Sequence, residues 1–157
     1  MAKPLSEKVL EQICKAEELY HRLILIAAPS GSGKTAALQD VAVRTGASLL
    51  NLNLEISRRM LDLTERQRAL ELPKVLEQVV GRDKSLVLLD NIEILFDVTL
   101  EQDPLRLLQG ASRNRTVVAA WNGTLEGGYL NYATPEHPEY QRYPRRELVV
   151  VCPEVMA

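Results

Sequence analysis

Near its N-terminus the chain has an apolar hexapeptide that runs directly into a loop of glycine and serine. Residues 23–28 read Leu-Ile-Leu-Ile-Ala-Ala, and Pro-Ser-Gly-Ser-Gly follows at 29–33. A short apolar run bounded by turn residues is typical of a strand that is buried on both faces of a parallel sheet. Residues 34–45 then have helical composition, and Gly46 is well placed to end that helix. A strand, a glycine loop and a helix in this order predict an α/β domain.

The loop itself carries the residues that are needed to hold a phosphate chain. Residues 28–35 match the P-loop pattern, with Ala28 where the first glycine is usual. Glycines let backbone N–H groups face an anion, and the start of the following helix favours negative charge. Lys34 is expected to neutralise phosphate, and Thr35 to bind Mg²⁺. With ATP and Mg²⁺ as cofactors, the expected binding residues are Pro29, Ser30, Gly31, Ser32, Gly33, Lys34, Thr35 and Ala36.

The rest of the chain repeats the alternation of strands and helices, which predicts a single P-loop domain over residues 1–157. The sheet is expected to be five-stranded, mainly parallel and flanked by helices. Besides 23–28, the strands are expected at 48–53, 86–89, 116–120 and 147–152. Besides 34–45, the helices are expected at 6–20 (within an N-terminal segment 1–21), at 56–80 with Pro73 as an interruption or early end, and at 104–112.

A carboxylate follows the apolar strand at 86–89. Asp90 would lie at the carboxyl end of that strand, where open α/β sheets bind ligands, and is expected to hold Mg²⁺ together with Thr35. Hydrolysis also needs a group that orients water, and the next residue, Asn91, cannot act as a base. Glu93 is the nearest carboxylate, and it either faces the site or is solvated at a helix start. Slow hydrolysis is therefore predicted.

The strand at 116–120 leads into Trp121-Asn122-Gly123. Asn122 could reach the γ-phosphate or its attacking water from this strand end, and the alternative is an ordinary Asn-Gly turn. The chain has only seven aromatic residues, and five of them fall between 121 and 143. Residues 122–145 are expected to form an aromatic, proline- and glycine-rich loop, which is either functional or packed over the sheet. It ends near Arg142, Arg145 and Arg146, which are either a basic surface turn or a source of an arginine that acts in trans in a homo-oligomer.

The overall charge and the longest apolar runs exclude several classes of protein. A net charge of −2 argues against binding nucleic acid by charge alone, and no apolar run is long enough to cross a bilayer. The four arginines at 58, 59, 66 and 68 alternate with carboxylates, which favours a solvated, ion-paired face and leaves direct DNA contact open. Cys14 and Cys152 lack metal-ligand spacing, and no secretory signal is recognisable at the N-terminus, so reduced thiols and a cytoplasmic chain are expected.

With these motifs assembled, the chain resembles the BrxF family, the small P-loop ATPases of BREX phage-defence systems. The likeness rests on segments 28–35, 51–55 (Asn-Leu-Asn-Leu-Glu), 88–91 (Leu-Leu-Asp-Asn), 121–130 (Trp-Asn-Gly-Thr-Leu-Glu-Gly-Gly-Tyr-Leu), 137–140 and 143–144. The resemblance implies an AAA+-like core, Asn122 in a sensor position, and other BREX defence proteins as partners in an antiviral assembly. Few residues follow the fifth expected strand, so no C-terminal lid domain is expected.

The sequence thus predicts a weak ATPase whose catalytic candidates are Lys34, Asp90, Glu93 and Asn122. Two other functions stay open. Asn91 and the missing lid favour a nucleotide-dependent adaptor that does not hydrolyse ATP. The length and the succession of strands also permit a small-molecule kinase. In kinases the strand with the metal-binding carboxylate commonly neighbours the P-loop strand, whereas in the ATPase class another strand lies between them, so the strand order separates the two.

Overall fold

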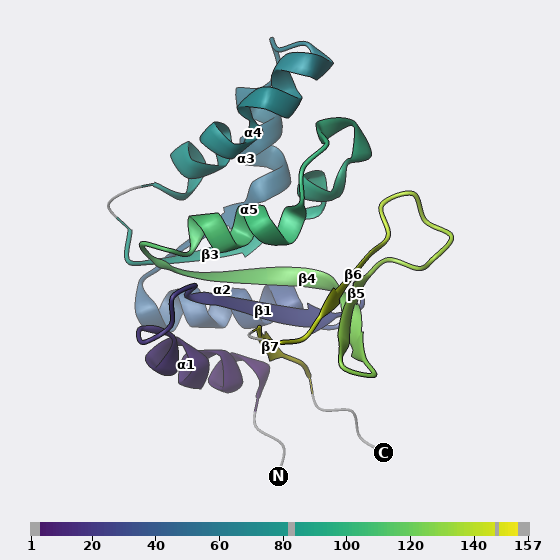
Figure 1. Ribbon diagram of the computed structural model, residues 1–157. Helices are drawn as coiled ribbons and strands as arrows, with labels where there is room; N and C mark the ends of the chain where they lie inside the picture. The colour runs from purple at the N-terminus through teal and green to yellow at the C-terminus, as the bar shows by residue number, and fades with distance from the viewer. Residues whose placement is uncertain (1–3, 82–83, 147, 154–157) are drawn as a thin grey trace.

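The computed structural model describes residues 4–81, 84–146 and 148–153, and its strands form one sheet (Figure 1). Five of the strands are parallel, in the order β2–β3–β4–β1–β7, which confirms the expected architecture. They are β1 (Leu23–Ala28), β2 (Ser48–Asn51), β3 (Leu86–Asp90), β4 (Thr116–Glu126) and β7 (Val149–Val151). Of the strand predicted at 147–152, residue 147 lies outside the described residues.

The order of the strands distinguishes the ATPase class from the small-molecule kinase alternative. Strand β1 pairs with β4 and β7, whereas β3 pairs with β4, with Leu89 opposite Ala119. The strand that ends in Asp90 is therefore separated from the P-loop strand by β4. This is the order expected for the ATPase class rather than for the kinase alternative.

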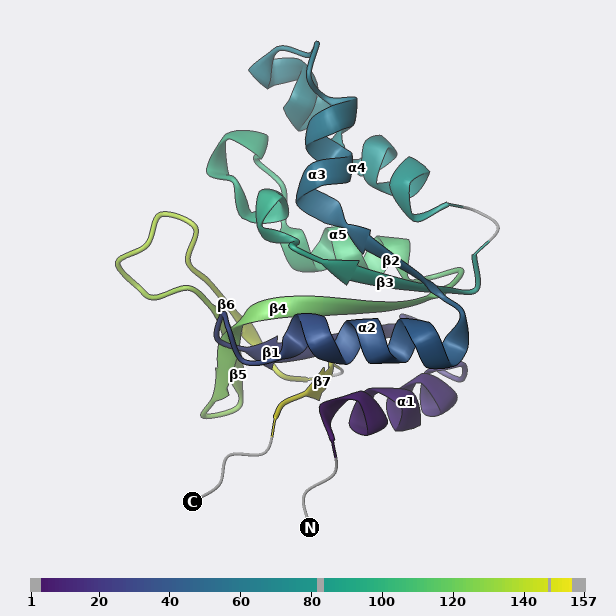
Figure 2. The same cartoon turned by 180° about the vertical axis from the view of Figure 1, so that it is seen from behind.

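The internal strand β1 is apolar throughout because helices cover both faces of the sheet, as Figures 1 and 2 show. All six residues of β1 are buried. Ile24 and Ile26 pack against α1 (Leu5–Ala16) and α2 (Lys34–Thr45) on one face. Leu23 and Leu25 belong to a second core on the other face. That face is covered by α3 (Leu52–Arg59), α4 (Glu65–Val80) and α5 (Pro104–Ala111).

The helix predicted at 56–80 is two helices, and its break does not lie at Pro73. The chain leaves α3 at Met60 and starts α4 at a capping box formed by Thr64 and Gln67. Pro73 lies inside α4 and has no N–H to donate to the carbonyl four residues earlier. Gln102 supplies the missing donor, because its Nε2 lies 2.8 Å from Ala69 O. The helix therefore continues through Pro73.

The predicted strand at 48–53 ends two residues early. Asn51 caps α3 through its side chain, which accepts a hydrogen bond from Leu54 N at 3.1 Å. A side-chain acceptor at this position favours the start of a helix over continuation of the strand. Asn53 therefore lies in the first turn of α3.

The segment 122–145, which was predicted to be a loop, is largely an antiparallel extension of the sheet. Strand β4 continues to Glu126 and pairs with β5 (Tyr129–Tyr132), which pairs with β6 (Gln141–Pro144). The turn between β4 and β5 is Gly127-Gly128, and both glycines have positive φ (+57° and +81°). Two left-handed residues form the tight turn that fits a twisted hairpin. Only the connection between β5 and β6, residues 133–140, is a loop.

A cluster of aromatic side chains fixes this extension to the sheet. Trp121 is fully buried, and its Nε1 donates to Asn131 O on β5 at 3.0 Å. Phe96 lies in the 3₁₀ helix Glu93–Phe96, stacks on Tyr132 with ring centroids 3.5 Å apart, and meets Trp121 edge-on at 5.1 Å. Tyr143 on β6 also contacts Trp121, at 5.9 Å. Most of the chain's aromatic residues thus hold one hairpin in place.

Candidate functional site

The polar residues singled out in the sequence converge at one edge of the sheet. The glycine loop follows β1, Asp90 ends β3, and Asn122 ends the part of β4 that pairs with β1. Because these strands are parallel, their carboxyl ends meet at the same edge. The cavity between them has a volume of about 210 Å³ and is lined by Ser30, Gly31, Gly33, Lys34, Thr35, Asp90, Asn91, Glu93, Ala120 and Asn122.

The glycine loop has the backbone conformation that an anion cradle requires. Gly31 and Gly33 have φ of +82° and +87°, in the left-handed region that side chains rarely adopt. Gly33 is also the N-cap of α2, and no side chain caps its first N–H groups. These donors at the start of α2 are therefore available to a phosphate.

The ammonium group of Lys34 lies inside the loop. Its Nζ donates to Ala28 O at 2.6 Å and to Pro29 O at 2.8 Å, and the residue is only 5% exposed. Desolvation by burial lowers the pKa of Lys34, while the nearby carboxylates of Asp90 and Glu93 act in the opposite direction. A desolvated cation with three N–H donors, two of them on carbonyls, is well placed to exchange these carbonyls for phosphate oxygens.

Thr35 and Asp90 form an oxygen pair that suits Mg²⁺. Thr35 Oγ1 donates to Asp90 Oδ2 at 2.7 Å, and Asp90 Oδ1 accepts from Asn91 N at 3.0 Å. Within the described ranges there is no group of three or more His, Cys, Asp or Glu that could hold a metal. A site with one or two protein oxygens is typical of Mg²⁺, which otherwise keeps water and substrate phosphates. The residues present therefore fit this ion.

Glu93 faces the site, which was one of the two alternatives predicted for it. One carboxylate oxygen, Oε1, accepts a hydrogen bond from Asn122 Nδ2. The other, Oε2, accepts from Asn53 Nδ2 at 3.2 Å. The carboxylate is thus held between two amide groups, at the border of the cavity that Lys34 and Asp90 also line.

Asn53 is the site residue that the sequence interpretation missed. Its Oδ1 accepts from Ile94 N at 2.7 Å, and its backbone N–H donates to Asn91 O at 2.9 Å. Asn53 therefore connects α3 with the segment that carries Glu93. Because Ile94 N–H donates to its Oδ1, the Asn53 amide presents its Nδ2 group to Glu93. The sequence carries a signal for it, because Asn51 and Asn53 lie at and just after the carboxyl end of a strand, but the strand predicted at 48–53 includes both residues.

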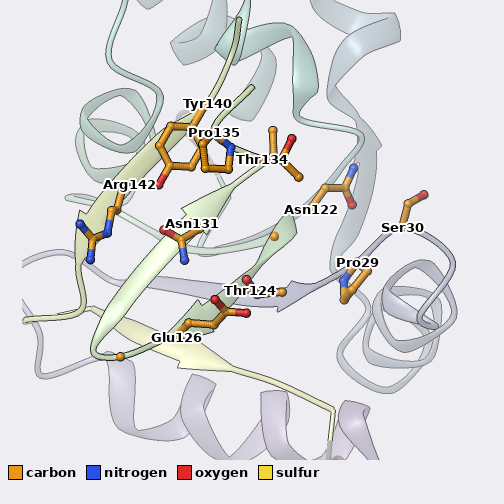
Figure 3. Close-up of a pocket in the computed structure, with 13 residues that line it drawn as sticks. Pro29, Ser30, Asn122, Thr124, Glu126, Asn131, Thr134, Pro135, Tyr140 and Arg142 are labelled. Carbon is orange, nitrogen blue, oxygen red and sulfur yellow. The ribbon is translucent and has the colours of Figure 1, made fainter. Parts of the chain in front are cut away.

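A second cavity, of about 680 Å³, adjoins the first and is shown in Figure 3. The two share Ser30 and Asn122 in their linings, and the larger one continues over β4 and β5 to Tyr140 and Arg142. The Arg142 guanidinium lies 3.7 Å from the ring centroid of Tyr129. Arg142, Arg145 and Arg146, the predicted candidates for action in trans, are all exposed.

No helix in the described part of the chain has the length and apolarity of a membrane span.

Comparison with known proteins finds matches among solved structures. No protein-family model matches the chain, and no curated protein matches it in sequence. Among solved structures it is similar to DnaA from Aquifex aeolicus bound to AMPPCP, with a TM-score of 0.44 and 18% identity over 74% of this chain and 36% of that one. It is also similar to PCH-2 from C. elegans, with a TM-score of 0.49 and 14% identity over 98% of this chain and 42% of that one. The chain spans less than half of each of these proteins.

Proposed function

We propose that this protein binds ATP with Mg²⁺ and hydrolyses it slowly. The proposal rests on three groups that line one small cavity. They are the buried Lys34 ammonium, the oxygen pair Thr35–Asp90, and the Glu93 carboxylate that two amides hold. A cradle of N–H groups with a buried cation suits a polyphosphate. The oxygen pair Thr35–Asp90 suits the ion that accompanies it.

Each residue has a part in this proposal. Lys34 neutralises the β- and γ-phosphates, while Thr35 and Asp90 bind Mg²⁺. When bound, the ion supplies charge neutralisation at the phosphate oxygens. Glu93 orients the attacking water, because each carboxylate oxygen can accept more than one hydrogen bond and keeps capacity beyond the two amides. Asn122 contacts both Glu93 and the cavity, so it can sense the terminal phosphate.

A specific observation also favours the adaptor that does not hydrolyse ATP. Asn91 replaces the carboxylate that often follows the metal-binding Asp, and it has φ of +52°, so its backbone is fixed in a left-handed turn. Glu93 is already engaged by two amides. A single-turnover assay separates the two functions, since the adaptor releases no phosphate above the rate without protein.

Replacing Glu93 by glutamine is expected to slow phosphate release at least about tenfold without weakening ATP binding. Glutamine cannot act as a base, and its side chain presents an acceptor oxygen to one of the two amides that hold Glu93 but an NH₂ donor to the other. Single-turnover phosphate release and isothermal calorimetry measure the two quantities. A matched control is Glu55→Gln on α3, because Glu55 pairs with Arg59 outside the site. A rate equal to that of the parent would remove Glu93 from the mechanism.

A companion variant tests how Glu93 is positioned. Asn53→Ala removes one of the two amides and leaves Ile94 N without its acceptor. We expect kcat to fall while the ATP affinity stays within about twofold, since Asn53 does not line the small cavity. Equal losses in kcat and affinity would instead indicate general damage to the site.

For its biological context, we propose that the protein acts within a bacterial BREX defence assembly, beside other BREX proteins. The most specific segment of the resemblance, residues 121–130, forms the end of β4, the Gly-Gly turn and the start of β5. This hairpin borders the large cavity that opens beside Asn122. A partner seated there would meet the residue that senses the terminal phosphate, which is how nucleotide state could reach it.

The mass in solution is expected to rise when ATP and Mg²⁺ are added. The exposed arginines at 142, 145 and 146 can reach a neighbouring copy, and a bound γ-phosphate gives such an arginine an anionic partner. Light scattering with and without ATP measures the mass, and alanine at each arginine in turn identifies the one involved. A monomer that is unchanged by nucleotide would contradict action in trans and favour the adaptor.

A further inference from the structure

A third cavity, of about 400 Å³, lies on the other side of the P-loop strand from Asp90. Its walls are the start of the loop with Ser32, the β4–β5 hairpin from Gly123 to Glu126, and the residues after β7, Cys152 and Pro153. In Figures 1 and 2 the β4–β5 turn lies beside the carboxyl end of β7. Most of the lining is apolar, with Thr124 and Glu126 as the polar exceptions in the hairpin. We call this cavity the apolar cleft.

The strand order gives the phosphate chain a direction. Asp90 and Asn122 come from β3 and β4, which lie on one side of β1, whereas β7 lies on the other. The terminal phosphate belongs with Lys34, Asp90 and Asn122, because a P-loop lysine reaches the β- and γ-phosphates while the loop backbone holds the α and β groups. The nucleoside, at the opposite end of the phosphate chain, therefore lies on the β7 side of the loop.

We propose that the apolar cleft binds the purine nucleoside of the nucleotide, an inference that rests on the proposed function. Its volume and its mainly apolar walls with a few polar groups are those of a small-molecule site. Pro29, Leu125 and Pro153 offer apolar surface to a base. Thr124 and the Glu126 carboxylate can accept hydrogen bonds from ribose hydroxyls or from an exocyclic amine. The hairpin then forms the outer wall of the nucleoside site.

The far wall of the cleft is tied to the rest of the fold. Lys8 Nζ on α1 donates to Cys152 O at 3.2 Å, and Val151 pairs with Ile26 of the P-loop strand. On the near side, Trp121 and Asn131 fix the hairpin, as described above. Gly123 lies so close to β5 that a Cβ there would be 1.7 Å from Asn131 O. Both walls are thus held by contacts that need no ligand, which favours a preformed site.

The large polar cavity of Figure 3 is the rival location. It has an unpartnered buried acceptor, Asn131 Oδ1, that a base could use. However, it shares Ser30 and Asn122 with the small cavity, so it opens at the end where the terminal phosphate is expected. A nucleoside there would require the phosphate chain to run backwards through the loop.

Cys152 makes the two locations distinguishable, because it lines the apolar cleft and not the polar cavity. The chain has two cysteines, so Cys14→Ser leaves Cys152 as the single thiol. Its alkylation by N-ethylmaleimide is followed by intact mass at alkaline pH, since burial raises the pKa of this thiol. ATP–Mg²⁺ at ten times its Kd is expected to slow labelling about tenfold, and tripolyphosphate–Mg²⁺ at the same saturation less than about twofold.

The remaining outcomes each decide one question. If both ligands bind by calorimetry and ATP leaves the Cys152 rate unchanged, the nucleoside site is wrong while the proposed function stands. Equal protection by both ligands would also overturn it, because phosphates alone would explain the effect. If neither ligand binds, the proposed function itself fails.

A second variant, Tyr140→Ala, changes only the polar cavity and is expected to keep the parent's ATP affinity, whereas a tenfold loss would place the base there.

Discussion

Replacing Lys34 by alanine is expected to weaken ATP binding about 100-fold, which corresponds to nearly 3 kcal/mol. The ammonium group is already buried among backbone carbonyls in the loop, so no other side chain needs to move before a phosphate replaces these acceptors. Each hydrogen bond from a charged donor to a phosphate oxygen contributes more than a neutral one. Calorimetric titration with ATP–Mg²⁺ and with tripolyphosphate–Mg²⁺ measures the loss, which should be the same for both ligands.

The control for this variant is Lys74→Ala, which removes an exposed lysine from α4, far from the loop. Lys34→Arg is a second comparison and should not restore affinity, because a planar guanidinium does not fit where a compact ammonium lies between two carbonyls. If Lys34→Ala binds ATP within about threefold of the parent, the nucleotide proposal loses the residue on which it depends. Circular dichroism of the free variant ensures that the affinity is measured on folded protein.

The parts of this structure that the sequence predicted are those set by local pattern. The buried strand at 23–28 and the strand at 86–89 follow from continuous apolar runs, and the loop between β1 and α2 follows from glycines that need positive φ. Asp90 and Asn122 could be placed in one site because each comes at the end of an apolar run that forms a strand of the parallel sheet. No knowledge of side-chain contacts was needed for that step.

The parts that the sequence did not predict depend on contacts between distant segments. Pro73 is tolerated in α4 only because Gln102 reaches Ala69 O, and nothing near Pro73 indicates this. Asn53 holds Glu93 because α3 packs against the 3₁₀ segment that starts at Glu93. Alternation along 129–132 is short and is preceded by two glycines, so β5 becomes recognisable only through its pairing with β4. Tertiary structure, rather than propensity, decides each of these cases.

Trp121→Ala is expected to lower the free energy of unfolding by about 4 kcal/mol. The indole is fully buried and contacts the rings of Phe96, Tyr132 and Tyr143, so its removal leaves a cavity between the sheet and the hairpin. It also leaves Asn131 O without the indole N–H that donates to it. Urea denaturation followed by circular dichroism measures the loss, since Trp121 is the chain's only tryptophan and its fluorescence disappears with it.

Trp121→Phe separates the contribution of the aromatic packing from that of the indole hydrogen bond to Asn131 O. A phenyl ring keeps most of the aromatic contacts but cannot donate to Asn131 O, so we expect a loss of roughly 1–3 kcal/mol. Tyr20→Ala removes an aromatic ring that is 69% exposed and should change stability by less than about 0.5 kcal/mol. If Trp121→Ala costs no more than Tyr20→Ala, the aromatic cluster does not fix the hairpin.

Trp121→Phe also tests whether the stability of the hairpin affects the nucleotide site. Gly123 and Glu126, which wall the apolar cleft, lie on the strand that Trp121 attaches to β5. If the hairpin loosens in Trp121→Phe while the P-loop stays intact, ATP binds more weakly and tripolyphosphate binds as it does to the parent. Lys34→Ala, by contrast, weakens both. The two variants therefore divide the binding free energy into the part that the loop supplies to the phosphates and the part that the hairpin supplies to the nucleoside.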